Sequence, residues 1–258
     1  MKIVEREFSQ KQLDLFLTIK NKCYENFDDL TIVNNIFLIF NKLLENKDKG
    51  GRYLECGVFR GGTLIPVINF IKSEIGMFKW DVIGVDTFSG FPSSKEHHPN
   101  DLPSKFTELY RDNLITKEHF EKAKIRTNNL KDISHLETEY FDYDFSSLFK
   151  FCDKNGASLI KGKFENVLSS LSKALEIDDK LNILYIDCDL YESYLECLNN
   201  LYDNVVDGGS IIFDEYYSHK YPGARIAVNE FFENKKGYFE KYKTPEGFER
   251  WCFVKELK

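Results

Sequence analysis

The sequence predicts an α/β fold in which a mostly parallel β-sheet carries helices on both faces, an arrangement called doubly wound. Two observations support this prediction. Short apolar runs rich in strand-forming residues alternate with longer amphipathic segments between residues 53 and 232. Several of the short runs also end in acidic residues, and open α/β sheets bind their ligands at the carboxyl ends of the strands.

The chain has the size and composition of one domain. Its 258 residues are 42% hydrophobic, which is sufficient for a full core. No linker rich in glycine or serine and no internal repeat divides it, so we expect a single domain over residues 1–258. Within it, we expect a helical cap over residues 1–50 and a Rossmann-like core over residues 51–258.

Charge and composition argue against several classes of partner. The net charge of −7 and the pI of about 5.4 disfavour a nucleic-acid backbone or an anionic membrane as the main partner. No apolar stretch reaches the length of a membrane span, and no secretion signal follows the first six residues. The six cysteines show neither a CxxC pair nor a zinc-ligand spacing, which favours buried free thiols in a reducing cytoplasm.

Apolar stripes define the N-terminal helices. Residues 10–46 are predicted to be helical and to cover one side of the mouth of the sheet. One stripe consists of Leu13, Phe16 and Leu17, and a longer one of Ile32, Ile36, Ile39, Phe40, Leu43 and Leu44. The helical pattern ends at the segment 49–52, which contains two glycines.

The first strand of the core leads into a glycine-rich turn. We expect a strand from Tyr53 and a helix over residues 63–73, with Gly57, Gly61 and Gly62 between them. Glycines at such a point permit tight turning and close approach of the backbone to a ligand. Their spacing differs from the GxGxxG pattern of dinucleotide-binding folds, and a tight strand-to-helix connection without a ligand would explain them as well.

The next strand, residues 81–86, ends in Asp86. In nucleoside-binding α/β folds, an acid at this point accepts hydrogen bonds from ribose hydroxyl groups. A helix cap or a turn is the alternative role for Asp86. The glycine turn and the acid together are much more specific than either feature alone.

A polar segment with three prolines follows, at residues 87–112. It is predicted to form a long loop beside the mouth of the sheet, and such loops often act as lids. His97 and His98 lie in this segment. They either bind substrate or are exposed loop residues without a role.

The remaining elements continue the alternation of strand and helix. We expect a helix over residues 145–155, a strand over 157–160, a helix over 167–175 and a strand from residue 181. A helix marked by Leu195, Leu198 and Leu201 comes next. The last predicted elements are a strand over 210–213, a helix over 222–232 and a strand over 250–254.

Four carboxylates follow two of these strands. Asp187 and Asp189 come after the strand from residue 181, and Asp214 and Glu215 come after residues 210–213. Residues two apart on an extended chain share a face, and two neighbouring acids repel each other unless a cation or a proton separates them. If the two strands are neighbours, the four carboxylates meet at one edge and outline a site for a hard cation.

Five motifs of the chain belong together. They are E-C-G-V-F-R-G-G at 55–62, D-T-F-S-G-F-P at 86–92, I-D-C-D-L-Y-E-S at 186–193, D-G-G-S-I-I-F-D-E-Y at 207–216 and Y-P-G-A-R-I-A-V at 221–228. In these motifs, their order and their spacing, the chain resembles the macrocin O-methyltransferase-like family of S-adenosylmethionine-dependent sugar O-methyltransferases. The resemblance implies a Rossmann-like class I methyltransferase fold whose last strand runs antiparallel. It also implies a divalent cation, usually magnesium, a sugar hydroxyl as acceptor, and a homo-oligomer.

The resemblance also implies roles for individual residues. The methionine part of S-adenosylmethionine would lie along Glu55, Gly57, Arg60, Gly61 and Gly62. Asp86 would hold the ribose with Thr87 and Ser89 nearby, and the adenine would lie by Gly162 and Phe164. Asp187, Asp214 and Glu215 would bind the metal, and Asp189 would be the general base. The family usually has a second aspartate where this chain has Glu215.

This chemistry agrees with the residue types. A sugar hydroxyl is a poor nucleophile at neutral pH, so a Lewis-acidic cation and a carboxylate that takes the proton would both promote its reaction. Two other readings stay open: a catechol-like phenol or other small hydroxyl compound as acceptor, and a non-catalytic protein that only binds the cofactor. The four carboxylates argue against the second, because simple binding requires no metal site.

Overall fold

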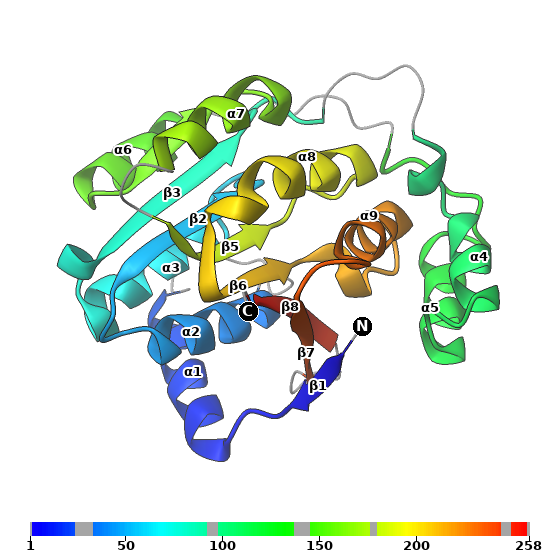
Figure 1. The fold of residues 1–258 in the computed structure, drawn as a ribbon, viewed down its shortest axis with the longest axis horizontal. Helices are drawn as coiled ribbons and strands as arrows, with labels where there is room; N and C mark the ends of the chain where they lie inside the picture. The colour runs from blue at the N-terminus through cyan, green and yellow to red at the C-terminus, as the bar shows by residue number, and fades with distance from the viewer. Residues whose placement is uncertain are drawn as a thin grey trace.

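A mixed sheet of eight strands forms the centre of the described chain (Figure 1). The computed structural model describes residues 2–23, 33–91, 98–136, 145–175, 180–243 and 249–256. The strand order is β1-β7-β8-β6-β5-β2-β3-β4. The strands are β1 (Ile3–Arg6), β2 (Gly51–Cys56), β3 (Trp80–Asp86), β4 (Ser158–Lys161), β5 (Leu181–Ile186), β6 (Val205–Phe213), β7 (Gly237–Lys243) and β8 (Glu249–Lys255).

The sheet is parallel except around β8. Strands β4, β3, β2, β5 and β6 all run in one direction, whereas β8 is antiparallel to both of its neighbours, β6 and β7. The prediction of a mostly parallel doubly wound sheet with an antiparallel last strand is therefore confirmed. The register pairs Cys56 with Ile186 and Ile186 with Phe213, so β2, β5 and β6 end side by side.

Helices cover both faces of the sheet (Figure 1). Helices α7, α8 and α9 pack on one face, and α2 and α3 on the other. Tyr185 of β5 points into the core on the α2 side, whereas Leu184 and Ile186 point into the core on the α8 side. Burial on both faces explains why residues 183–186 of β5 form an uninterrupted apolar run. The helices are α1 (Gln10–Cys23), α2 (Val33–Glu45), α3 (Leu64–Phe70), α4 (Lys105–Arg111), α5 (Lys117–Arg126), α6 (Ser146–Lys154), α7 (Phe164–Leu175), α8 (Tyr191–Leu201) and α9 (Pro222–Phe232).

Two strands and one helix differ from the sequence prediction. β1 and β7 were not predicted; β1 has one half-buried residue and three exposed ones, so it lacks the alternating apolar pattern of a strand. The segment 87–112, expected to be a loop, contains α4 in its second half, where Phe106 and Leu109 are buried. In the N-terminal stripes Phe16 is buried but Leu17 is 43% exposed, and Ile32 lies outside the described residues.

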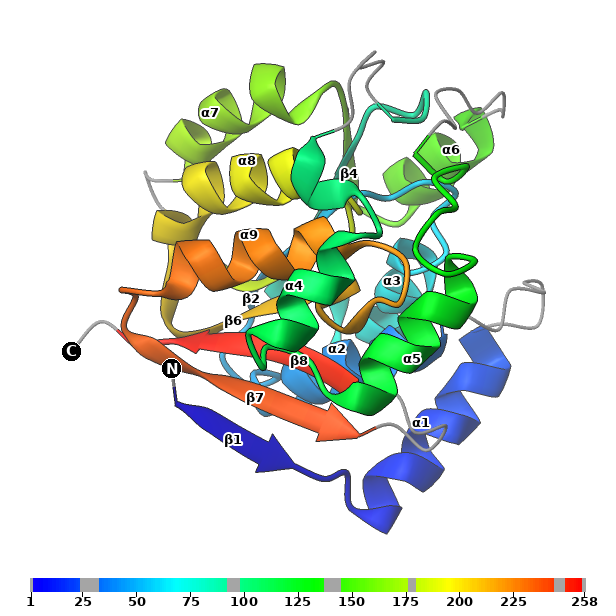
Figure 2. The ribbon, with the colours of Figure 1, turned by 90° about the vertical axis from the view of Figure 1, so that its right-hand side faces the viewer.

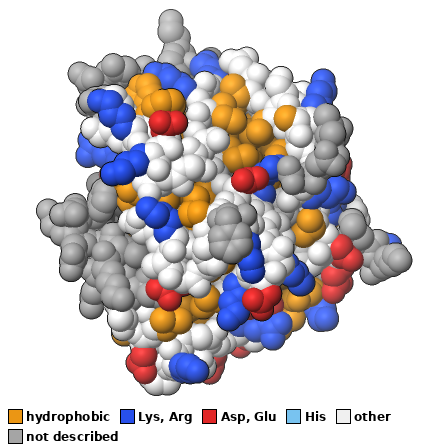
Figure 3. Space-filling model, turned by 90° about the vertical axis from the view of Figure 1, so that its left-hand side faces the viewer, with side chains coloured by type: hydrophobic (Ala, Val, Ile, Leu, Met, Phe, Trp, Pro, Cys, Tyr) orange, Lys and Arg blue, Asp and Glu red, His pale blue; other side chains and the backbone are white. Residues whose placement is uncertain are grey.

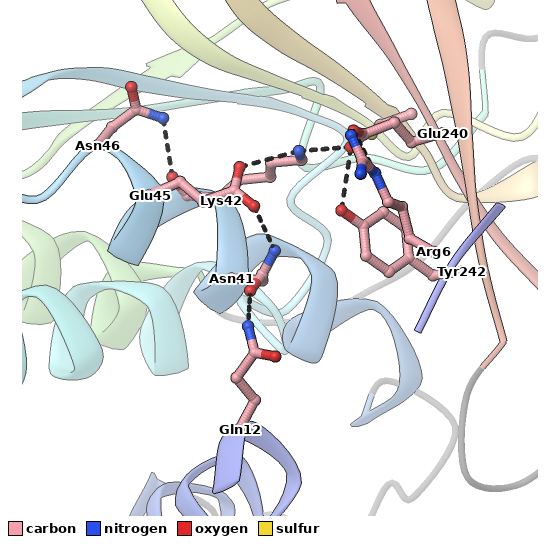
Figure 4. A network of polar contacts seen from close by, with 9 residues as sticks. Arg6, Gln12, Asn41, Lys42, Glu45, Asn46, Glu240 and Tyr242 are labelled. Atoms are coloured by element: carbon pink, nitrogen blue, oxygen red, sulfur yellow. Dashed lines mark hydrogen bonds and ion pairs between the residues drawn. The ribbon is translucent and has the colours of Figure 1, made fainter. Parts of the chain in front are cut away.

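A buried ion-pair network joins the N-terminal elements to the sheet (Figure 4). Lys42 Nζ of α2 lies 2.6 Å from Glu240 Oε2 of β7, and both side chains are almost fully buried. Arg6 Nη2 of β1 lies 2.8 Å from Glu240 Oε1, and the Tyr242 hydroxyl donates a 3.0 Å hydrogen bond to Glu240 Oε2. Glu240 therefore ties α2, β1 and β7 together.

Replacing Lys42 by methionine is expected to destabilise the protein by about 1–3 kcal/mol, because the buried Glu240 carboxylate loses its nearest cation and keeps only the half-exposed Arg6. Urea unfolding measures this change. The control is Lys105→Met, which breaks a partly exposed pair with Glu108 and is expected to cost under about 1 kcal/mol. Equal losses for the two variants would contradict the structural importance of the Lys42–Glu240 pair.

Helices α4 and α5 lie beyond the carboxyl ends of β5 and β6, close to the start of α9 (Figures 1 and 2). On the face seen in Figure 3, basic side chains are interspersed with acidic and hydrophobic ones and do not form one continuous patch. None of the helices in the described ranges combines the length and apolar character that crossing a bilayer requires.

Candidate active site

The predicted acidic cluster is present at the ends of β5 and β6. The Asp187 amide donates to the Cys56 carbonyl (2.8 Å), and the Asp214 amide donates to the Ile186 carbonyl (3.0 Å). Backbone pairing thus continues one residue beyond the strands and brings the two aspartates side by side. Asp187, Asp214 and Glu215 each place a carboxylate oxygen within 4.8 Å of the others.

Burial and mutual repulsion determine the electrostatics of this cluster. Burial raises the pKa of Asp187 well above its ordinary value, and the negative charges of Asp214 and Asp189 raise that pKa further. The pKa of Glu215 is raised in the same way, by burial and then by Asp214 and Asp187. Arg250 Nη1 lies 4.0 Å from Asp214 Oδ1, at the outer limit of an ion pair, and compensates only part of the negative charge.

The donor set fits a small hard cation. Three carboxylate oxygens converge at the end of the sheet, and oxygen is the ligand type that magnesium prefers. A cation between them would relieve the mutual repulsion of these carboxylates. Glu215 Oε2 accepts a 2.6 Å hydrogen bond from the Tyr194 hydroxyl, which holds this side chain beside the two aspartates.

Asp189 reaches the cluster through a turn. The strand ends at Ile186, and the Leu190 amide bonds to the Cys188 carbonyl at 2.6 Å, so that Asp189 is the central residue of a γ-turn with a φ of 62°. The sequence prediction assumed an extended chain from Asp187 to Asp189, and this assumption is wrong. The turn, and not an extended strand, determines where the Asp189 side chain lies. A positive φ at a residue other than glycine is strained, and such strain concentrates at functional sites.

The Asp189 carboxyl faces polar groups. Burial, followed by the negative charge of Asp214, raises the pKa of Asp189 to about 7, while Lys220 and a hydrogen bond from the Tyr221 hydroxyl act in the opposite direction. The segment that carries Lys220 and Tyr221 is held by Ser218, whose Oγ accepts hydrogen bonds from both of their amides at 3.0 Å. His119 Nε2 of α5 contacts the Ser218 carbonyl at 2.8 Å.

The glycine-rich turn and Asp86 form a second group of predicted site residues. Asp86 Oδ2 accepts hydrogen bonds from the amides of Val58 and Phe59, both at 2.7 Å, and Oδ1 accepts one from Phe88 at 2.7 Å. Asp86 therefore organises the turn itself. Thr87 Oγ1 also lies 3.4 Å from Oδ1, but its single proton goes to the closer Gly90 carbonyl at 2.8 Å. A carboxylate has about four acceptor positions, so one stays open to a ligand hydroxyl.

Gly57 explains how the turn passes so close to the acidic cluster. Its φ is 92°, and a Cβ atom at this position would lie 1.7 Å from the Asp187 carbonyl oxygen. No other residue type fits there without moving one of the two segments. The turn continues through Arg60 to Gly61 and Gly62; Arg60 is exposed and its guanidinium lies 5.1 Å from the ring of Phe59.

Replacing Asp86 by alanine is expected to weaken S-adenosylmethionine binding by about 1–3 kcal/mol, because both a charged acceptor and the support of the turn are lost. Calorimetric titration measures the affinity. The control is Asp81→Ala on the same strand, whose side chain is 67% exposed and pairs with Arg52; cofactor affinity should not change. An unchanged affinity for Asp86→Ala would remove Asp86 from the cofactor site.

Glu55 is buried next to these two groups. Its side chain is 1% exposed, and Oε2 accepts a 2.7 Å hydrogen bond from the Tyr53 hydroxyl. Burial raises the pKa of Glu55 to about 8, and the charges of Asp86 and Asp214 add to the effect. Glu55 is therefore close enough to Asp86 beside the turn and to Asp214 in the acidic cluster for both charges to affect its pKa.

The other predicted cofactor residues lie around Asp86. Thr87 Oγ1 donates to the Gly90 carbonyl (2.8 Å) and accepts from the amide of Ser89, which is itself exposed. The Gly162 amide donates to the Asp86 carbonyl at 2.9 Å, which places Gly162 beside Asp86. Phe164 is the first residue of α7; its side chain is partly buried and packs against the core on the α8 side of the sheet.

This edge of the sheet is covered in part by residues that no sequence pattern indicated. Asp101 is 3% exposed, and its Oδ1 accepts a 2.8 Å hydrogen bond from the Tyr191 amide at the start of α8. Gly223 lets that carboxylate approach α9, since a Cβ there would lie 2.0 Å from Asp101 Oδ1. His98 stacks on Tyr191 with ring centroids 4.3 Å apart, and His97 lies outside the described residues.

Comparisons with known proteins identify a family and two similar folds. The sequence profile described as "Macrocin-O-methyltransferase (TylF)" matches residues 39–240. The chain is similar to the solved structure of the O-methyltransferase NovP, with a TM-score of 0.55 and 20% identity over 96% of this chain and 100% of that chain. It is also similar to the calicheamicin methyltransferase CalS11, with a TM-score of 0.52 and 16% identity over 96% of this chain and 93% of that chain. At these identities the structural likeness supports the fold. No curated protein sequence matches the chain.

Proposed function

The chain belongs to the macrocin O-methyltransferase family, and from this premise we propose that it methylates a sugar hydroxyl group with the help of a divalent cation. As a member of the family it is an S-adenosylmethionine-dependent O-methyltransferase. The observation that supports the metal-dependent reaction best is the convergence of Asp187, Asp214 and Glu215 within 4.8 Å, with Asp189 beside them.

Asp187, Asp214 and Glu215 are the proposed metal ligands, and magnesium is the ion that their oxygen donors suit best. A divalent cation held there would act as a Lewis acid and make the acceptor hydroxyl easier to deprotonate. Tyr194 holds one oxygen of Glu215 in place, so this longer ligand is expected to contribute a single oxygen.

Asp189 is the proposed general base. Its carboxylate would take the proton from the acceptor hydroxyl while the hydroxyl oxygen forms its bond to the methyl carbon and the methyl–sulfur bond breaks, with neutral S-adenosylhomocysteine as the leaving group. The proton ends on an Asp189 oxygen, where Tyr221 and Lys220 stabilise the charged form of the carboxyl before transfer. The turn at Asp189 is held on one side by the end of β5, and Ser218 holds the facing segment.

The proposed cofactor site runs from the acidic cluster along the glycine-rich turn to Asp86. Glu55 and residues 57–62 would lie along the methionine part, Asp86 would bind the ribose, and the adenine would lie between Thr87–Ser89 and Gly162–Phe164. The sulfonium methyl is activated in the free cofactor, so positioning the acceptor oxygen in line with it supplies much of the remaining rate enhancement.

The proposed partner of the protein is a small-molecule sugar or glycoside substrate. Neither a nucleic acid nor a membrane is proposed as a partner. The mixed surface charge and the acidic pI support this. Five buried free cysteines, Cys56, Cys152, Cys188, Cys197 and Cys252, support a cytoplasmic location. A homo-oligomer stays a prediction that size-exclusion chromatography with light scattering would test.

The acceptor class is tested by incubating the enzyme with S-adenosylmethionine, magnesium and a panel of deoxysugar glycosides, nucleotide sugars and catechols, followed by mass spectrometry. We expect the product to carry one added methyl group on a sugar ring. Methylation of catechols alone would show that the acceptor is a phenol. Cofactor binding without turnover of any acceptor would support the non-catalytic reading.

A further inference from the structure

The hydroxyl group of Tyr185 lies between two of the proposed metal ligands. It is 3.0 Å from Asp187 Oδ2 and 2.9 Å from Asp214 Oδ1, and the Tyr185 side chain is fully buried. A tyrosine hydroxyl has one proton, so it donates to one of these oxygens at a time. The hydroxyl is therefore within hydrogen-bond distance of both carboxylates and orients whichever of them receives its proton.

Asn35 of α2 completes this arrangement from the other side. Its Nδ2 lies 3.0 Å from the Tyr185 oxygen, and the Asn35 side chain is 4% exposed. Because an amide nitrogen can only donate, the Tyr185 oxygen acts as acceptor toward Asn35, and the hydroxyl proton is directed to Asp187 or Asp214. Hydrogen bonds thus run in one direction, from α2 through Tyr185 to the acidic cluster.

The amide oxygen of Asn35 indicates that this residue does not serve stability alone. Asn35 Oδ1 is buried and has no hydrogen-bond partner within the part of the chain that the structure describes. A buried acceptor without a partner destabilises the folded state, and an apolar side chain of similar shape would avoid that cost. Asn35 is therefore better explained by what its Nδ2 group does to Tyr185 than by the packing of α2.

We propose that Tyr185 and Asn35 form a positioning pair that holds Asp187 and Asp214 in the geometry that binds the metal ion. The inference rests on the proposed metal-dependent function and extends the metal site to helix α2. Groups that bond to metal ligands from behind orient those ligands, and their loss typically reduces metal affinity about 10–100-fold. Neither residue contacts the ion in this proposal; both act through the two aspartates.

The test measures Mn²⁺ affinity by calorimetry on the full chain without cofactor, which separates metal binding from turnover. Tyr185→Phe removes one hydroxyl and is expected to weaken Mn²⁺ binding at least about tenfold. The matched control is Tyr242→Phe, which removes a buried hydroxyl that donates to Glu240, a carboxylate outside the site. The control should bind Mn²⁺ as the wild type does.

A second pair of variants separates positioning from stability. Asn35→Leu is expected to weaken Mn²⁺ binding while the melting temperature stays unchanged or rises, because the unpartnered oxygen is removed as well. The control is Asn41→Leu on the same helix, which loses its 2.7 Å bond to Glu45 and should lower the melting temperature without changing Mn²⁺ affinity.

The outcomes distinguish this inference from the proposed function. Wild-type Mn²⁺ affinity in both Tyr185→Phe and Asn35→Leu would overturn the positioning pair and leave the metal-dependent function intact. Equal weakening in Tyr185→Phe and Tyr242→Phe would also overturn it, since any buried hydroxyl would then have the same effect. A wild-type protein that binds neither Mn²⁺ nor Mg²⁺ would overturn the metal-dependent function and this inference with it.

Discussion

Replacing Asp189 by asparagine is expected to lower kcat by roughly 10²–10⁴-fold, because the variant keeps the shape of the side chain but cannot accept the proton. Metal affinity, cofactor affinity and melting temperature should stay close to those of the wild type. A loss confined to kcat is the signature of a group that acts in the transition state. The measurements are steady-state kinetics, calorimetry with Mn²⁺ and S-adenosylmethionine, and thermal unfolding.

The alternative role for Asp189 is to cap the start of α8. It predicts a stability loss of about 1 kcal/mol and little change in rate. The structure argues against this role, because the first amide of the helix, that of Tyr191, already bonds to Asp101 Oδ1. Asp101→Ala is therefore the variant that should show the cap effect. A folded, metal-binding Asp189→Asn enzyme with near-normal turnover would rule out the assignment as base.

Removing the metal is expected to abolish activity, and adding magnesium is expected to restore it. Asp187→Asn and Asp214→Asn should each lose most metal affinity, since each removes one of three charged ligands, while cofactor affinity is kept. Excess magnesium should partly rescue these two variants but not Asp189→Asn. Activity in EDTA, followed by titration with magnesium, measures the first effect, and calorimetry measures the second.

Glu240→Gln serves as a control for the metal variants. It neutralises another buried carboxylate, which pairs with Lys42 and lies outside the acidic cluster. It is expected to lower stability and to leave metal affinity unchanged. Full activity of the wild type in excess chelator would contradict the metal-dependent mechanism and leave Asp187, Asp214 and Glu215 as structural residues.

The strands that carry the site were predictable because their environment is uniform. Residues 183–186 of β5 and 211–213 of β6 are buried and read as short apolar runs, and the acids that follow these two strands mark the carboxyl end of the sheet. β1 and β7 were not predictable in the same way. β1 is an edge strand with three exposed residues, and its place depends on the distant contact of Arg6 with Glu240.

The residues of the candidate site also differ in how far the sequence could predict them. The sequence indicated Asp187, Asp214 and Glu215 because they follow neighbouring strands. Tyr185 also had a local signal, since it lies two residues before Asp187, but as one residue of an apolar run it read as core. The contacts of Asn35 and Asp101 join segments 150 and 90 residues apart, so no local pattern reveals them.

The metal-to-ligand geometry in a crystal grown with S-adenosylhomocysteine, magnesium and a sugar acceptor tests the central proposal most directly. We expect an ion about 2.0–2.1 Å from oxygens of Asp187, Asp214 and Glu215. We also expect an acceptor hydroxyl within about 2.6–3.2 Å of an Asp189 oxygen. A crystal with acceptor and cofactor bound but no ion between these carboxylates, or with the hydroxyl out of reach of Asp189, would contradict it.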